Sequence, residues 1–433
     1  MQYLPNILFA LTLVAGVGYF TMNVKKLMRN IRMGADIDVS DNKPQRLKNM
    51  LLIAFGQSKM VRRPIAGILH VLVYLGFIII NIEVLEIIID GLLGTHRIFS
   101  GIGKAYGILI GCFEILAVLV FVSVVVFWIR RNVLKLKRFW KSEMTSWPKN
   151  DANLILYFEM VLMTLFLVMN ATDVHFQEMG SGNVVSQYIT IWFEGLSVST
   201  FHFIERTAWW LHILGILVFL NYLYFSKHLH ILLAFPNTYF GSLKPKGALD
   251  NLESVTKEVR MMMDPNIDPF AAPPDNAEVP AKFGASDVQD LNWLQLLNAY
   301  TCTECGRCTS ECPANQTGKK LSPRKIMMDT RDRLEEVGKN IDANKGVFKE
   351  DGKQLLDTYI TREELWACTS CNACVEACPV SINPLSIIME MRRYLVMEQS
   401  AAPVELNNMM SNIENNGAPW PYNQMDRLNW KNE

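Results

Sequence analysis

The stretches CTECGRCTSECP (residues 302–313) and CTSCNACVEACP (residues 368–379) are two copies of one cysteine pattern. Each copy has three cysteines separated by two residues, then a fourth cysteine followed by proline. Two-residue spacers wrap a loop around three corners of an iron–sulfur cubane, and the more distant fourth cysteine ligates the other cluster. The repeat therefore predicts two [4Fe–4S] clusters. A pair of zinc sites is the alternative, which two complete copies with the terminal proline disfavour.

This crossed arrangement predicts two ligand sets. The first cluster is expected on Cys302, Cys305, Cys308 and Cys378. The second is expected on Cys368, Cys371, Cys374 and Cys312. Cysteines grouped in this way within a chain of 433 residues do not resemble a secreted disulfide scaffold. We therefore expect the clusters to face a reducing compartment.

Helices are expected on both sides of the cysteine loops. The last cysteine of the first copy and the first of the second, Cys312 and Cys368, are separated by 55 residues, too many for the compact hairpin of a bacterial ferredoxin. Ser322 followed by Pro323 predicts a helix start between the copies, and Thr361 with Glu364 predicts a capping box before the second copy. Pro384 opens a further helix after it.

The N-terminal half is apolar and contains five stretches long enough to cross a bilayer, which takes about 20 residues. They run from Leu4 to Val24, Ile65 to Ile89, Ala105 to Ile129, Ala152 to Asp173, and Thr207 to Leu233. Residues 1–235 are therefore predicted to form a five-helix transmembrane bundle.

Basic residues are unevenly distributed over the loops of this half. Residues 25–64 contain ten Lys and Arg and residues 130–150 contain seven, whereas the alternate loops contain only Arg97, Lys104 and Arg206. Cytoplasmic loops are enriched in Lys and Arg. We therefore expect the N-terminus outside and the cluster domain in the cytoplasm.

Histidine is scarce in the chain, so its placement in the apolar stretches is informative. His70 lies in the second stretch, and His212 and His230 lie in the fifth. In one continuous helix, eighteen residues make five whole turns at about 3.6 residues per turn, so His212 and His230 would share a face that His228 does not. Neutral imidazole is an axial ligand of b-type haem, and polar residues at membrane depth mark functional sites. We expect His70 and His230 to bind a haem.

Five apolar stretches with this histidine placement resemble the membrane cytochrome b subunit of respiratory nitrate reductase. They also resemble the related cytochromes of heterodisulfide reductase and of sulfite reductase complexes. The resemblance covers residues 1–235 and implies two haems between the second and fifth helices. It assigns His70 and His230 to the inner haem and His212 to the outer haem.

The sequence departs from that family at one position. The second histidine of the second helix, ten residues after the first, is replaced by Ile80. Either another residue completes an outer haem with His212, or the outer haem is absent. One or two b-type haems are therefore expected. The residues that could substitute are His96, His175 and His202.

A quinone site is expected at the outer end of the bundle. Glu83 and Glu86 lie near the outer end of the second stretch, close to the predicted level of His212. Quinone reduction and oxidation exchange protons, for which these carboxylates are suited; alternatively, they only reach the membrane interface. The expectation depends on an outer haem, because a hydrocarbon core of about 30 Å would otherwise separate the redox centres. With one haem, the quinone would bind near His70 on the cytoplasmic side.

Two further segments follow the bundle. Residues 236–285 contain repeated prolines and are predicted to be a linker with one helix at 248–263. Residues 286–400 resemble the α-helical ferredoxin of succinate dehydrogenase and, more closely, the C subunit of heterodisulfide reductase. In the tail, 401–433, the segment ENNGAPW at 414–420 resembles one that leads toward a cysteine-rich catalytic domain in proteins of that C-subunit type; a disordered terminus is the alternative. The resemblance implies a cysteine-rich cytoplasmic partner like the heterodisulfide reductase B subunit.

Together these features predict an all-α protein, a five-helix transmembrane bundle followed by an α-helical ferredoxin domain. We expect it in the cytoplasmic membrane of a bacterium or archaeon, surrounded by lipid and exchanging electrons between quinone, haem, the clusters and a cytoplasmic redox partner. The zero net charge gives no indication of a nucleic-acid partner. The chain shows no phosphate loop or nucleophile constellation, so substrate chemistry would belong to the partner. A haem-free membrane-anchored ferredoxin and a redox-sensing protein are the alternatives.

Overall fold

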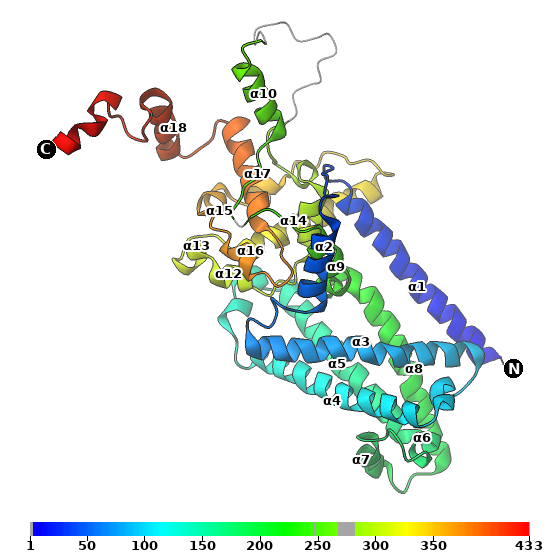
Figure 1. The fold of residues 1–433 in the computed structure, drawn as a ribbon. Coiled ribbons are helices and arrows are strands. Elements are labelled where there is room, and N and C mark those ends of the chain that lie inside the picture. The colour runs from blue at the N-terminus through cyan, green and yellow to red at the C-terminus, as the bar shows by residue number, and fades with distance from the viewer. Residues whose placement is uncertain (1–2, 246, 267–281, 433) are drawn as a thin grey trace.

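The computed structural model describes residues 3–245, 247–266 and 282–432. Within these ranges the chain is helical and contains no β-strand. Long helices form a bundle at one end, and a compact domain of shorter helices lies against the other (Figure 1). The predicted all-α fold class is confirmed.

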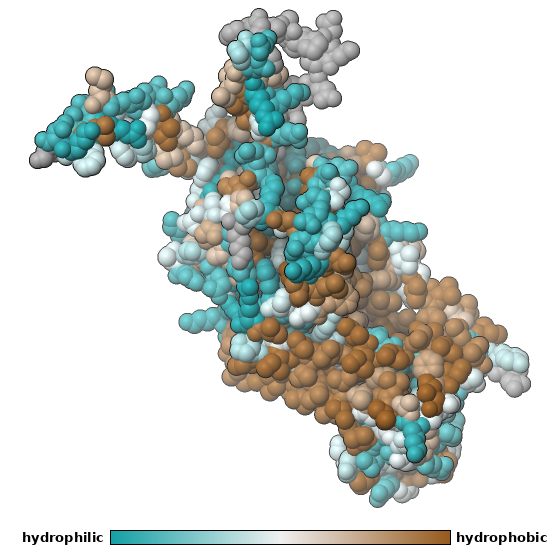
Figure 2. Space-filling model, in the orientation of Figure 1, coloured by the Kyte–Doolittle hydropathy of each residue, from teal (hydrophilic) through white to brown (hydrophobic). Residues whose placement is uncertain are grey.

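Five helices are long and apolar enough to cross a membrane, as predicted. They are α1 (Leu4–Ile31), α3 (Pro64–Leu93), α4 (Lys104–Asn132), α5 (Trp147–Thr172) and α8 (Val198–Tyr222). A proline stands in the first turn of α1, α3 and α5, where its missing N–H has no helical acceptor to lose. Figure 2 shows their outer surface as a broad apolar band, with hydrophilic residues above and below it.

The fifth helix differs from the prediction of one continuous helix over residues 207–233. Helix α8 ends at Tyr222, two short 3-10 turns follow, and α9 (His230–Phe240) begins at His230 itself. Ser226 interrupts the helix in an extended conformation, and its Oγ accepts the N–H of His228 at 3.0 Å. His212 and His230 therefore lie on different helices, and the shared-face argument is wrong. The linker also begins later than residue 236, because α9 continues through Pro236.

Short helices close the ends of the bundle. Those at the end nearest the cluster domain are α2 (Lys43–Met50) and the π-helical turn Leu51–Phe55. At the opposite end lie α6 (Val174–Glu178) and α7 (Ser186–Thr190). In the predicted linker, α10 (Glu253–Met263) is shorter than expected, and the prolines between 267 and 281 lie outside the described residues.

The cluster domain consists of the expected short helices. Its helices are α11 (Trp293–Thr301), α12 (Arg307–Glu311), α13 (Pro313–Gln316), α14 (Pro323–Ala343), α15 (Arg362–Trp366), α16 (Ala373–Ala377) and α17 (Pro384–Met397). Ser322 caps α14, and Thr361 with Glu364 forms the predicted capping box. Helix α18 (Val404–Asn416) extends away from the domain with no buried residue (Figure 1).

One apolar core joins the bundle to the cluster domain. Leu27 and Ile31 of α1 and Phe219 of α8 belong to the same buried cluster as Leu291 and Leu296. Continuity of this kind requires the two parts to pack as one unit, because separating them would expose the shared apolar surface.

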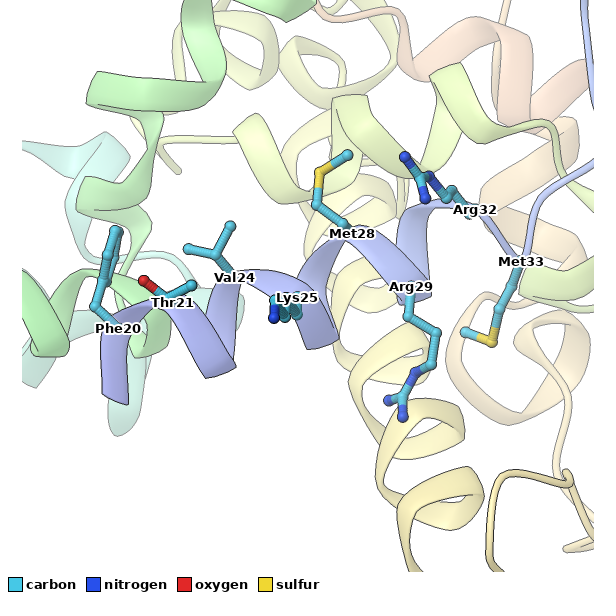
Figure 3. A pocket seen from close by; sticks show the side chains of 8 residues that line it. All are labelled: Phe20, Thr21, Val24, Lys25, Met28, Arg29, Arg32 and Met33. Atoms are coloured by element: carbon cyan, nitrogen blue, oxygen red, sulfur yellow. The ribbon is translucent and has the colours of Figure 1, made fainter. Parts of the chain in front are cut away.

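The end of α1 is held on the cluster domain by polar contacts as well. Asn30 donates to the Tyr300 hydroxyl at 2.9 Å, and Arg29 donates to the Gly338 carbonyl at 3.1 Å. Just before these contacts, the last turns of α1 line a cavity of about 650 Å³ (Figure 3). Its lining changes from Phe20 and Val24 to basic residues including Arg32, which marks where α1 leaves the apolar band.

Buried charge in the cluster domain gives a stability prediction. The Arg333 side chain is fully buried and pairs with Asp287 at 2.7 Å and Asp351 at 2.6 Å. Arg333→Ala leaves both carboxylates without their cation, so we expect the free energy of unfolding to fall by about 3–5 kcal/mol. The control Arg362→Ala removes an exposed pair with Asp357 and should cost less than about 1 kcal/mol. Denaturant unfolding followed by cluster absorbance measures both, and equal losses would contradict this account.

Candidate metal centres

The two cysteine loops have the same backbone conformation. The first cluster loop (residues 302–312) has left-handed residues at Glu304 and Gly306, and the second (residues 368–378) has them at Ser370 and Asn372. These positions correspond one to one between the copies. In both loops a short helix follows and ends at the fourth cysteine. The sequence repeat is therefore a structural repeat as well.

The fold brings the cysteines together in the predicted crossed pattern. Cys302, Cys305 and Cys308 line one cavity together with Cys378 of the other loop. Cys312, from the first loop, interacts electrostatically with Cys368 and Cys374. Cys374 also borders the cavity of the first set, so the two centres are neighbours. This arrangement supports the crossed ligand sets, which stay predictions.

The chemistry of these thiols fits iron ligation. Burial raises the pKa of Cys302 and Cys374 to about 12, and that of Cys378 to about 11. Several thiolates can share such a buried space only around cations. Backbone N–H groups also approach sulfur, from Ser370 to Cys368 at 3.4 Å and from Ile382 to Cys378 at 3.3 Å. Hydrogen bonds of this kind are found around iron–sulfur clusters.

The structure brings His70 of α3 and His230 of α9 together as the inner histidine pair. Their ring centroids are 6.4 Å apart. A metal about 2 Å from each imidazole nitrogen, with about 1 Å more to each ring centre, requires a spacing of about 6 Å. His230 Nδ1 lies 3.1 Å from the Lys227 carbonyl, which leaves Nε2 free for a metal. The buried Nδ1 of His70 has no hydrogen-bond partner among the described residues.

His228 is oriented toward a different group. Its Nε2 lies 3.9 Å from a carboxylate oxygen of Glu159 on α5, and its ring stands perpendicular to His230. The choice of His230 over His228 is therefore supported by these contacts, although the helical argument for it failed.

His212 lies apart from the other histidines. Its ring contacts Phe166 of α5, and its buried Nδ1 has no hydrogen-bond partner among the described residues. His96 and His175, two of the predicted substitutes for the missing outer ligand, contact each other, and His96 also contacts Asp173 at 3.1 Å. His202 is exposed on α8. Among the described residues, no other histidine ring contacts His212, so these contacts offer no second axial ligand for an outer haem.

The end of the bundle that is predicted to face outward contains a buried polar network. Glu83 and Glu86 are each only 3% exposed, so the interfacial alternative is wrong for both. Glu86 accepts from the Tyr106 hydroxyl at 3.0 Å, and Arg97 pairs with Asp173 at 2.7 Å. Arg97 lies in a loop, as the sequence indicated, and is buried there because it pairs with Asp173, which is 76 residues away in the chain.

Lys227 connects the inner histidine pair to the first cluster loop. Its ammonium pairs with the buried carboxylate of Glu304, between the first two cysteines, while its carbonyl contacts His230 Nδ1. Arg331 of α14 holds the other Glu304 oxygen at 2.9 Å. Burial opposes the ionised form of Glu304, yet Lys227 and Arg331 lower its pKa. No local sequence pattern predicts this contact. The one available signal was the charged residue Glu304 between two predicted cluster ligands.

Comparison with known proteins agrees with the cluster assignment. Residues 301–382 match the model of the 4Fe-4S dicluster domain. "Probable iron-sulfur-binding oxidoreductase FadF" of Bacillus subtilis is 28% identical over 99% of this chain and 61% of its own length. "EtfAB:quinone oxidoreductase" of Syntrophomonas wolfei is 25% identical over 94% of this chain and 57% of its own. The chain thus spans about three fifths of the length of these curated relatives.

Other similarities are restricted to part of the chain. A "Probable membrane-anchored ferredoxin" of Chromohalobacter salexigens is 32% identical over 36% of this chain and 25% of its own length. Heterodisulfide reductase subunits C and D of Methanosarcina also match. No solved structure matches. The chain is thus related to iron–sulfur oxidoreductases and carries a 4Fe–4S domain behind five candidate membrane helices.

The crossed ligand sets can be tested with three cysteine variants. We expect Cys308→Ser to damage the first cluster and Cys312→Ser the second, because Cys312 lies with Cys368 and Cys374. Cys112→Ser, on α4, is the matched control and should retain both clusters. Iron content and EPR spectra measure the outcome. Selective loss of the first cluster in Cys312→Ser would overturn the assignment.

Proposed function

We propose that this chain carries electrons between a quinone in the cytoplasmic membrane and a cytoplasmic redox partner, through one b-type haem and two [4Fe–4S] clusters. The observation that carries the proposal is the contact of Lys227 with both His230 and Glu304. That residue connects a membrane histidine pair directly to a cluster loop, an arrangement that a simple membrane anchor would not need.

The inner histidine pair is the proposed haem site. His70 and His230 would supply the axial nitrogens, and the Lys227 carbonyl would fix the tautomer of His230. Bound there, a haem supplies one-electron chemistry at the end of the bundle nearest the clusters. The rest of the nitrate-reductase-like pattern, an outer haem on His212, has no support from the ring contacts described above.

A single haem moves the proposed quinone site to the inner side. An outer quinone by Glu83 and Glu86 would be separated from His70 by most of a hydrocarbon core of about 30 Å. The pair formed by His228 and Glu159 offers polar groups at membrane depth beside the haem site. Quinones need hydrogen-bonding groups of this kind close to the redox centre.

The second cluster is the proposed exit toward the partner. Cys371 is the exposed member of its ligand set, whereas Cys302, Cys312, Cys374 and Cys378 are buried. The name of the Syntrophomonas relative makes EtfAB a candidate partner, and the heterodisulfide reductase relatives make a cysteine-rich subunit another. The excess of basic residues in the loops before α3 and α5 supports a cytoplasmic position for both partners.

A haem-free membrane-anchored ferredoxin is the second candidate function. The Chromohalobacter relative is described as a probable membrane-anchored ferredoxin. The absorption spectrum of the purified protein separates the two candidates. A reduced α-band with the cluster shoulder supports the haem-containing carrier, and the shoulder alone supports the anchored ferredoxin.

Histidine variants test the haem site. We expect His70→Ala and His230→Ala each to remove the same low-spin haem signal, because low-spin iron requires both axial nitrogens. His228→Ala should retain it, since its Nε2 is directed at Glu159. EPR spectra and haem content per protein measure the outcome, with exposed His202→Ala as control. Loss in His228→Ala and retention in His230→Ala would contradict the assignment.

A further inference from the structure

Arg307 is a buried cation of the first cluster loop that contacts the segment before α3. It lies on α12, between Cys305 and Cys308, and is 4% exposed. Its guanidinium donates to the carbonyls of Lys59 and Met60 at 3.1 and 3.0 Å, just before α3. Neither acceptor is charged, and the described residues provide no carboxylate that pairs with it. A buried guanidinium in this situation lacks a counterion.

Arg138 is a second cation at the same place. It belongs to the 3-10 turn Lys137–Phe139. Its Cβ lies 3.5 Å from the position that a Cβ atom at Gly306 would occupy, so Arg138 is next to the first cluster loop. Its Nε is buried without a hydrogen-bond partner among the described residues. Burial lowers its pKa to about 10, so the side chain stays charged at neutral pH. Both arginines interact electrostatically with Cys305.

The first cluster is the anion that fits these two cations. Four thiolates give a [4Fe–4S] centre net negative charge, and the charge increases when it is reduced. A fixed positive charge nearby stabilises the reduced form more than the oxidised form. Arg307 also interacts electrostatically with His70 of the inner histidine pair.

We propose that Arg307 and Arg138 are the counterions of the first cluster, which raise its reduction potential and favour it as the cluster that exchanges electrons with the membrane. The inference rests on the proposed function for the direction of transfer. The second cluster has a comparable cation in Arg392, which donates to the Cys368 carbonyl and interacts electrostatically with Cys368. Arg392 therefore provides a matched control within the same chain.

The test is an EPR-monitored redox titration of the full chain, with the two signals assigned through Cys305→Ser and Cys371→Ser. In Arg307→Gln we expect the potential of the first cluster to fall and that of the second to stay unchanged. Arg392→Gln should show the reverse. Arg307→Lys keeps the charge and should restore most of the potential of the first cluster. Arg138→Gln repeats the test at a residue that does not hold the loop before α3.

Three results would overturn the inference. These are unchanged potentials in both Arg307→Gln and Arg138→Gln, a shift confined to the second cluster, or a shift that Arg307→Lys does not restore. The first result would mean that Arg307 has only a structural role, as hydrogen-bond donor to the carbonyls of Lys59 and Met60. A wild-type protein without a haem α-band would refute the proposed haem pathway, whereas the cluster potentials would still decide this inference.

Discussion

The ion pair between Lys227 and Glu304 is the contact on which the arrangement of the redox centres depends. It fixes the first cluster loop against the segment that presents His230, and Arg331 completes the charge balance. Removing one member of a buried pair leaves an uncompensated charge, so both partners must stay ionised. Because the folded-state pKa of Glu304 is lowered, its stabilising contribution is present at neutral pH and is lost as the pH falls through that value.

Around this contact, charged residues lie next to the inner histidine pair and the first cluster loop. The Lys227 carbonyl contacts a histidine, Glu304 fixes a cysteine loop, and Arg307, the proposed counterion of the first cluster, joins that loop to the segment before α3. The shared apolar core packs the bundle and the cluster domain against one another. The proposed order of centres then runs from His70 and His230 to the first cluster, the second cluster and the exposed Cys371.

Local signals were enough to predict much of this structure. Ser322 and Thr361 start helices where the sequence indicated, because capping depends on residues three positions apart. The break at Ser226 was missed, since the hydrophobic pattern continues through it and the partners of Lys227 are distant in sequence. Arg97 lies in the predicted loop, but its burial was not indicated by the sequence, because that burial depends on Asp173. Contacts between charges that are distant in the chain produce no local sequence pattern. Helix caps and cysteine ligand spacings do produce one, so they can be predicted.

The most direct test of the whole account follows reoxidation of the clusters through the membrane domain. The full chain in lipid nanodiscs is reduced, mixed with an oxidised menaquinone analogue, and observed at haem and cluster wavelengths together. The account predicts that both centres reoxidise in the wild type and that the clusters stay reduced in His70→Ala. Cluster reoxidation at the wild-type rate in His70→Ala would contradict it, because electrons would then reach the quinone without the histidine pair.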